Sequence, residues 1–317
     1  MTNTYFKEES LDDVMRVSLQ ALLKDGHPVK ATKGPNTELI GVTLEITNPR
    51  ARISRTESRG KPFSCLGELL WYLSACDDLA PIEYYIPRYA LDADDGKLRG
   101  AYGKRMFDWA GSNQFANIAE LLRRKSSSRQ AVVQLFDRHD IAQPQKDVPC
   151  TCTLQFLNRK DALHLVVTMR SNDVYLGFPH DVFCFTMLQE IMAVQLGLEL
   201  GTYKHFAASF HLYDERVDRV KEFLSEGWQQ TDLLMPPMPK GDPWPALTAL
   251  IAAERAIRTG GETTIGSAQR LDAYWEDLVR LLRIFRCTRD GQQDKLVELS
   301  NGFHSACFRS FVDRRAS

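Results

Sequence analysis

The sequence contains no long apolar segment. None of its 317 residues lie in a run that approaches the roughly 20 apolar residues of a membrane-spanning helix. The first residues lack the basic start and apolar core of a signal peptide. We therefore expect a cytoplasmic protein with no membrane partner.

Net charge is also nearly absent. The formal net charge is −1, so the chain has no general electrostatic attraction for nucleic acid, and we expect no nucleic-acid partner. Hydrophobic residues make up 44% of the chain, which is enough for a substantial core. At this length the core belongs to one large domain or to two smaller ones.

Cysteines are few and scattered. An odd number, seven, spread between positions 65 and 307 does not predict a disulfide framework, and reduced cytosolic thiols are the better interpretation. Cys150 and Cys152 are separated by one residue, whereas zinc and redox pairs usually have the spacing Cys-x-x-Cys. No second pair follows, so we expect no metal.

Apolar residues follow two periodicities. A period near 3.6 predicts helices, and alternation predicts strands. Gly26 is predicted to end the first helix, and Ser112 to be the N-cap of the third. This mixture favours an α+β fold. The predicted helices cover residues 11–23, 63–73, 113–124 and 181–196, and the predicted strands cover 39–46, 131–136, 152–156, 163–169 and 198–210.

The end of the chain has a different character. Five prolines between positions 236 and 245 indicate an irregular connection. We expect a catalytic domain over residues 1–235 and a helical C-terminal extension over 236–317, packed on the same domain. The helical patterning of this extension covers residues 245–259, 268–286 and 293–312.

Four short motifs follow one another between Val148 and Tyr213. A cysteine after proline comes first, and then an Arg-Ser-x-Asp cluster, a Leu-Gly-x-Pro turn and a His-x-Tyr pair. In this order the region resembles the active-site half of the thymidylate synthase family, and the resemblance covers about residues 38–225. The motifs are Pro149-Cys150, Arg170-Ser171-Asn172-Asp173, Leu176-Gly177-Phe178-Pro179 and His211-Leu212-Tyr213.

The resemblance implies a fold, a substrate class and a partner. The implied fold is thymidylate synthase-like, with a large mixed β-sheet flanked by helices. The implied partner is a second copy of the chain, in a homodimer that forms through the sheet and shares its active sites. The implied ligands are a pyrimidine nucleoside monophosphate and 5,10-methylenetetrahydrofolate. The helical end after Pro236 does not match the family's short closing segment.

Cys150 is the implied nucleophile. A thiolate that adds to C6 of a pyrimidine makes C5 electron-rich enough to attack a one-carbon donor. Such a thiol needs a lowered pKa, and Arg170 is the predicted cause, because its family counterpart lies beside the thiol. The alternative is that Cys150 is a small buried hydrophobic residue.

The family's phosphate-binding residues are matched by Arg129, Arg170 and Ser171. A planar guanidinium fits phosphate oxygens in two-point geometry. The resemblance implies that Arg129 reaches across from the other subunit. Gln130 stands where the family usually has a second arginine, so we expect Lys30 or Lys33 to supply a cation. Otherwise these lysines are solvated surface charges.

Asp181 replaces the asparagine that recognises uracil in the family. Cytosine has a donor at its 4-amino group and an acceptor at N3, and a carboxyl with one protonated oxygen complements both. An ionised carboxylate fits if N3 itself is protonated. An unpaired buried edge costs roughly 1–3 kcal/mol, so Asp181 predicts a cytosine nucleotide. The alternative is that Asp181 caps the helix that follows it.

The resemblance assigns roles to two further pairs of residues. His211 and Tyr213 match the pair that holds the sugar 3′-hydroxyl, and their spacing puts both on one side of a strand. Asn172 and Asp173 match the floor on which the donor's pterin and ordered waters lie. Asp173 has an alternative role as a turn residue before Leu176.

Two more residues have implied catalytic roles. Glu68 matches a buried glutamate that orders water and helps to move protons. A charged residue among so many apolar neighbours is rarely without a function. Tyr102 matches a tyrosine that assists proton removal at C5, and core packing is its alternative role.

Residues 84–89 contain no tryptophan. Methylating members of the family have tryptophans in this region, and their indoles shield the exocyclic methylene until hydride reaches it. A pocket without these indoles admits more water. The segment therefore favours a hydroxymethyl product over a methyl product.

Together these residues predict a folate-dependent deoxycytidylate 5-hydroxymethyltransferase. The expected reaction converts dCMP, 5,10-methylenetetrahydrofolate and water to 5-hydroxymethyl-dCMP and tetrahydrofolate. CMP remains an alternative substrate, and a C5-methylating thymidylate synthase that acts on dUMP or dCMP remains an alternative enzyme.

Two other functional classes compete with this prediction. A Cys-His-Asp hydrolase would use Cys150, His180 and Asp181, but adjacent side chains on one segment do not easily form such a relay. A nucleotide-binding protein without catalysis would not need Cys150, Glu68 and Tyr102 together.

Overall fold

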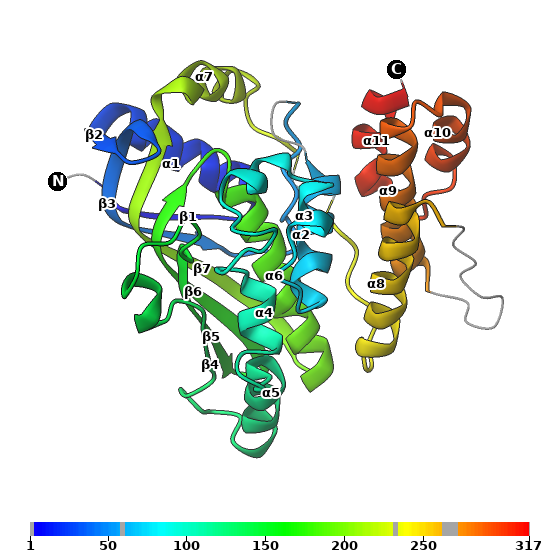
Figure 1. Cartoon of the computed structure of the whole chain (residues 1–317), viewed down its shortest axis with the longest axis horizontal. Helices are drawn as coiled ribbons and strands as arrows, with labels where there is room; N and C mark the ends of the chain where they lie inside the picture. Colours follow the sequence, from blue (N-terminus) through cyan, green and yellow to red (C-terminus); the bar gives the residue numbers. More distant parts are fainter. Residues whose placement is uncertain (1–2, 58–60, 231–233, 262–271, 317) are drawn as a thin grey trace.

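The computed structural model describes residues 3–57, 61–230, 234–261 and 272–316. Its centre is a seven-stranded mixed sheet, with helices α2 and α6 on one side and a group of C-terminal helices beyond them (Figure 1). This arrangement confirms the expected α+β class. Within the described ranges, no helix combines the length and the apolar character needed to cross a lipid bilayer.

The sheet has the strand order β1-β3-β7-β6-β5-β4, and β2 pairs with β3. β6 and β7 are parallel neighbours joined through helix α6, whereas β5 pairs antiparallel with β6, and β3 antiparallel with β7. The strands are β1 (Tyr5–Glu8), β2 (His27–Ala31), β3 (Gly34–Ile46), β4 (Val132–Gln134), β5 (Thr151–Arg159), β6 (Ala162–Asp173) and β7 (Glu199–Tyr213).

Along β6 and β7, fully buried side chains alternate with half-buried ones. The buried set includes Leu165 and Val167 of β6 and Tyr203 of β7, and it belongs to the main core beneath α6. The helices are α1 (Leu11–Asp25), α2 (Pro62–Leu73), α3 (Leu79–Glu83), α4 (Tyr102–Phe107), α5 (Gln114–Arg124), α6 (Phe178–Leu196), α7 (Val217–Ser225), α8 (Trp244–Thr259), α9 (Ala273–Arg289), α10 (Gln293–Ser300) and α11 (Arg309–Ala316).

Most predicted elements are present, and the differences can be traced to particular contacts. β1 and β2 were not predicted, because such short segments become strands only through pairing with β3. The N-cap of α5 is Asn113 rather than Ser112, since the Asn113 side chain accepts a hydrogen bond from the Ala116 N–H at 2.8 Å.

The helical patterning over residues 293–312 corresponds to two helices, α10 and α11, rather than to one continuous helix. The chain turns between α10 and α11, where the Asp277 carboxylate accepts hydrogen bonds from the backbone N–H groups of His304 and Ser305 at 3.0 and 2.8 Å. The predicted helix 268–286 begins instead at Ala273, and its first four positions lie outside the described residues.

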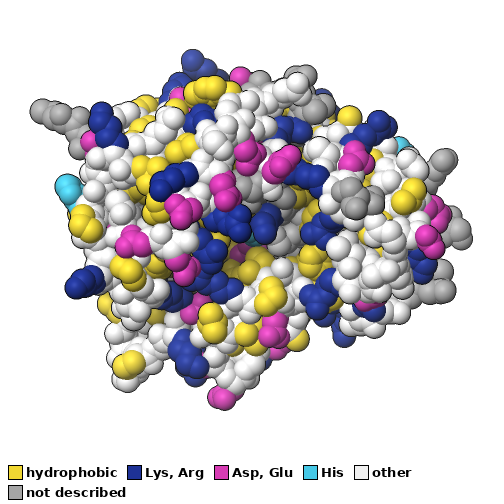
Figure 2. All heavy atoms as spheres, turned by 90° about the horizontal axis from the view of Figure 1, so that it is seen from above, with side chains coloured by type: hydrophobic (Ala, Val, Ile, Leu, Met, Phe, Trp, Pro, Cys, Tyr) yellow, Lys and Arg dark blue, Asp and Glu magenta, His cyan; other side chains and the backbone are white. Residues whose placement is uncertain are grey.

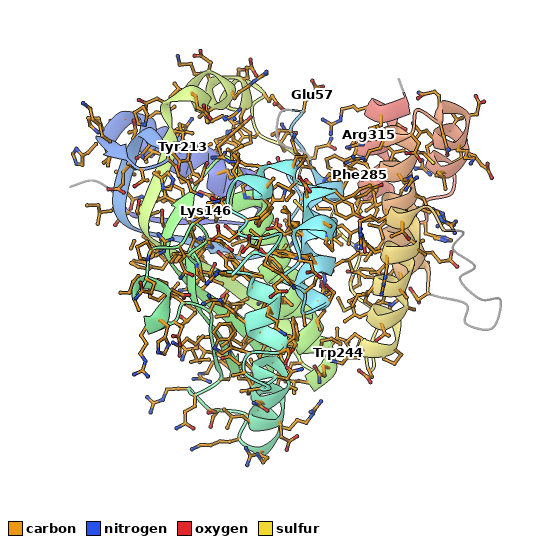
Figure 3. The ribbon with its side chains drawn as sticks, in the orientation of Figure 1. Glu57, Lys146, Tyr213, Trp244, Phe285 and Arg315 are labelled. Carbon is orange, nitrogen blue, oxygen red and sulfur yellow. The ribbon has the colours of Figure 1, made fainter. Side chains whose placement is uncertain are left out.

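The C-terminal helices pack against α2 and the segment that follows it. The rings of Phe63 and Phe285 stack with centroids 6.4 Å apart, and the Arg315 guanidinium lies 4.0 Å from the Phe63 ring centroid. Figure 3 shows Phe285 between α9 and α2. The Tyr85 hydroxyl also donates a hydrogen bond to Glu254 at 3.0 Å. One continuous apolar core therefore joins these helices to the sheet region.

Candidate active site

Several of the predicted site residues lie at one end of the sheet. Parallel pairing places Asp173 of β6 opposite His211 of β7. Thr151 begins the antiparallel β5 opposite Met169, and so Cys150 lies at the same end. Seen from above, Lys and Arg side chains gather around a hollow near the middle of the molecule (Figure 2).

Cys150 is half-buried, and its loop is held by Arg170. The Arg170 guanidinium donates hydrogen bonds to the carbonyls of Pro149 and Val148, both at 2.9 Å, through Nε and Nη2. Burial raises the pKa of the Cys150 thiol more than the Arg170 charge lowers it. The expectation of a lowered pKa was therefore wrong for this ligand-free site, because desolvation of the thiolate outweighs the arginine.

Tyr102 packs in the core, as its alternative role predicted. Its ring packs against Tyr72 and Phe185, with centroid distances of 5.5 and 6.2 Å. Its hydroxyl accepts a hydrogen bond from the backbone N–H of Thr151 at 3.1 Å. The hydroxyl is thus fixed beside the residue that follows Cys150, and its catalytic role stays a prediction.

Glu68 is buried and receives two tyrosine hydroxyls. Tyr72 and Tyr89 donate hydrogen bonds to the same oxygen, Oε1, at 2.9 and 2.5 Å. Burial raises the pKa of Glu68. Tyr89 comes from the segment without tryptophan, and its ring lies 5.6 Å from that of Trp71. No local pattern in the sequence connects Tyr89 with Glu68, and Tyr89 was not predicted as a site residue.

Asp181 is also buried, and it lies within helix α6 rather than at its N-cap. The N-cap is Gly177, so the interpretation of Asp181 as the cap was wrong. Asn172 donates a hydrogen bond from Nδ2 to Oδ2 of Asp181 at 2.7 Å. Burial, and then the nearby charge of Glu68, raise the pKa of Asp181 well above its ordinary value. Both causes favour the protonated form of Asp181.

The ends of strands β6 and β7 carry three more predicted site residues, Asp173, His211 and Tyr213. Asp173 accepts hydrogen bonds from the backbone N–H groups of Tyr175 and Leu176, both at 2.9 Å. Its side chain therefore stabilises the turn before Leu176, as the alternative role predicted. The rings of His211 and Tyr213 meet edge to face with centroids 5.1 Å apart. Asn172 was predicted in the floor of the pocket, and its amide forms a hydrogen bond with Asp181.

The remaining residues that were predicted to bind phosphate lie in different places. Lys33, in the turn between β2 and β3, forms an ion pair with Asp92 at 2.7 Å and lies near enough to lower the pKa of Cys150. Arg129 and Gln130 are exposed at the β4–β5 edge, where the Arg129 carbonyl accepts a hydrogen bond from Gln155 at 2.8 Å. Gln155 is five positions from Cys150, roughly 17 Å along a strand.

Asp147 is a second residue that sequence reasoning missed. It lies three positions before Cys150, and its carboxylate accepts a hydrogen bond from the Gly100 N–H at 2.7 Å. This contact joins the nucleophile loop to the loop before Tyr102. Across the described residues, no three His, Cys, Asp or Glu side chains form a group that could hold a metal ion.

Comparison with known proteins agrees with the family that the sequence motifs predict. A family model described as thymidylate synthase matches residues 49–236. The chain is 28% identical over 214 residues to a deoxyuridylate hydroxymethyltransferase of Delftia phage PhiW-14, covering 63% of this chain and 59% of that protein. For the enzyme of the same name in Bacillus phage SP01, identity is 31% over 211 residues, covering 62% and 55%.

Thymidylate synthases are also similar. One from Listeria monocytogenes serotype 4a (strain HCC23) is 31% identical over 136 residues, which cover 41% of this chain and 43% of that protein. The chain thus spans between about two fifths and three fifths of the length of these relatives.

Proposed function

Because the chain belongs to the thymidylate synthase family, we propose that it is a pyrimidine nucleotide C5 hydroxymethyltransferase that acts on dCMP. The bound cosubstrate, 5,10-methylenetetrahydrofolate, would supply the one-carbon unit. Arg170 and Lys33, whose charges both lower the pKa of Cys150, supply positive charge that would suit the anionic nucleotide and cosubstrate.

In the proposed mechanism each residue has a defined task. The Cys150 thiolate adds to C6 of the pyrimidine and leaves again when the product forms. Tyr102 takes part in removing the C5 proton, and Glu68 orders the water that supplies the hydroxyl oxygen. Arg170 binds the phosphate through Nη1, which has no hydrogen bond to any described residue. His211 and Tyr213 hold the sugar.

Asp181 is the observation that carries the choice of dCMP. A buried carboxyl in its protonated form offers one donor and one acceptor, and this pair can complement the cytosine edge when the donor faces N3. Its partner is an amide rather than a cation. Tyr89 supports the hydroxymethyl product, because its hydroxyl adds a polar group beside Glu68, where water is needed.

Asp181→Asn is expected to shift use from dCMP toward dUMP. The amide donates to O4 of uracil and accepts from its N3–H, so the ratio of kcat/KM for dCMP to that for dUMP should fall by at least about tenfold. Steady-state kinetics of both enzymes with both nucleotides measures the ratio. If both rates fall together and the ratio stays constant, Asp181 only supports the fold.

The relatives' names favour a second candidate, a deoxyuridylate hydroxymethyltransferase. Mass spectrometry of the products formed from dCMP, CMP and dUMP separates it from the first, and also separates hydroxymethyl from methyl products. Wild-type preference for dUMP would refute the cytidylate proposal.

We also propose a homodimer with shared sites. Arg129 is exposed and far from its own chain's Cys150, so it is available to a partner's site. The sheet face opposite α6 carries half-buried apolar side chains that a second copy would cover, namely Leu157 of β5, Val166 of β6 and Phe206 of β7. In each subunit we propose residues 1–235 as the catalytic region and 236–317 as an extension of the same domain.

Mixing two inactive variants tests the shared site. An Arg129→Ala subunit cannot supply the phosphate ligand to its partner's site, and a Cys150→Ser subunit lacks the nucleophile in its own site. In a mixed dimer, the Cys150 of the first subunit and the Arg129 of the second form one site with both residues intact. We expect activity to return when the variants are mixed and allowed to exchange subunits. A monomer in analytical ultracentrifugation, or no recovery despite exchange, would contradict the proposal.

A further inference from the structure

Asn172 and Asp181 form a buried pair. Asn172 is 4% exposed and Asp181 8%, and they come from the end of β6 and the first turns of α6. The amide Nδ2 of Asn172 donates a hydrogen bond to Oδ2 of the Asp181 carboxyl at 2.7 Å. Among the described residues, no cation forms an ion pair with Asp181, and its other oxygen, Oδ1, receives no hydrogen bond. Among the described residues, the amide is therefore the hydrogen-bonding group that distinguishes the two oxygens of Asp181.

A neutral carboxyl group can present its edge in two ways. With the proton on Oδ1, it donates to an acceptor opposite Oδ1 and accepts from a donor opposite Oδ2. With the proton on Oδ2, the pattern is reversed. Cytosine and uracil differ by the same reversal at N3 and C4, so a free carboxyl group could fit either base.

We propose that Asn172 is a positioning residue that sets the base preference by fixing the proton of Asp181 on Oδ1. The amide N–H needs an acceptor at Oδ2, so Oδ2 keeps its lone pairs, and one of them accepts from the 4-amino group. Oδ1–H then donates to N3 of cytosine. Uracil would place O4 against Oδ2 and N3–H against Oδ1–H, and both contacts are repulsive. This inference rests on the proposed function.

Asn172→Leu removes the donor but keeps similar volume. The proton of Asp181 can then move to Oδ2, so we expect dUMP to be accepted. The ratio of kcat/KM for dCMP to that for dUMP should fall by about tenfold, mainly because the value for dUMP rises. Asn172→Ala should give the same direction. Equilibrium binding of each nucleotide by calorimetry provides a readout that does not need turnover.

A nucleotide without the 4-amino group provides a sharper control. The 2′-deoxynucleotide of pyrimidin-2-one keeps the N3 acceptor, so its affinity should change by less than about threefold in Asn172→Leu. Asn36 is an equally buried amide on β3, and Asn36→Ala should leave the dCMP to dUMP ratio unchanged.

The outcomes separate the inference from the proposed function. A wild-type enzyme that prefers dCMP, with an unchanged ratio in Asn172→Leu, would refute the role of Asn172 alone. Equal loss of affinity for all three nucleotides would show a general defect of the pocket and would also refute it. A wild-type enzyme that prefers dUMP would refute the proposed function itself, and this inference with it.

Discussion

Cys150→Ser is expected to reduce turnover by at least about a thousandfold, because a serine hydroxyl does not add to C6 of a pyrimidine as a thiolate does. Nucleotide affinity should remain within a few-fold of wild type, since the phosphate and base contacts come from other residues. Turnover assays and calorimetric binding of dCMP measure the two effects.

Cys152→Ser is the matched control for this substitution. Cys152 is also half-buried and lies two positions further along, but it has no assigned chemical role. It should therefore keep most of the wild-type activity. Near-normal turnover in Cys150→Ser would remove covalent catalysis from the proposed mechanism.

The second large effect is expected for Glu68→Gln. Glutamine keeps the shape of the side chain and can accept the hydrogen bonds of Tyr72 and Tyr89, but it cannot exchange a proton. General acid–base catalysis commonly contributes at least about a hundredfold, so kcat should fall by that factor while the unfolding temperature changes little.

Tyr72→Phe is the control for Glu68→Gln. It removes one of the two hydrogen bonds to the same carboxyl oxygen and leaves the proton-exchanging group in place. We expect its kcat to fall by less than about tenfold. If Glu68→Gln and Tyr72→Phe lost activity equally, the role of Glu68 would be to hold the pocket together rather than to move protons.

Much of the framework was predictable from the sequence because it depends on local patterns. Alternation along residues 163–169 and 198–210 indicated β6 and β7, and helical periodicity indicated α1, α2 and α6. The ordered motifs around Cys150 and Asp181 indicated the family, which the family model supports. These signals lie within short segments or in the order of segments, and both are visible without coordinates.

Boundaries and caps were less predictable. The helical patterning over 293–312 is divided between α10 and α11, and Asp277, on α9, holds the backbone of His304 and Ser305 between them. That contact joins residues 27 and 28 positions apart. The apolar periodicity of residues 293–312 contains no information about this contact.

The sequence by itself determined the fold class and the order of the main strands and helices, and it predicted candidate site residues, because residue type and spacing carry that information. Only the tertiary structure decided how these residues act on one another. It brought Tyr89 to Glu68 and Asn172 to Asp181, and it raised the pKa of Cys150 despite Arg170. Hydrogen bonds between distant segments and the desolvation of a buried group depend on every neighbour in space, and those neighbours are set by the packing of the whole chain.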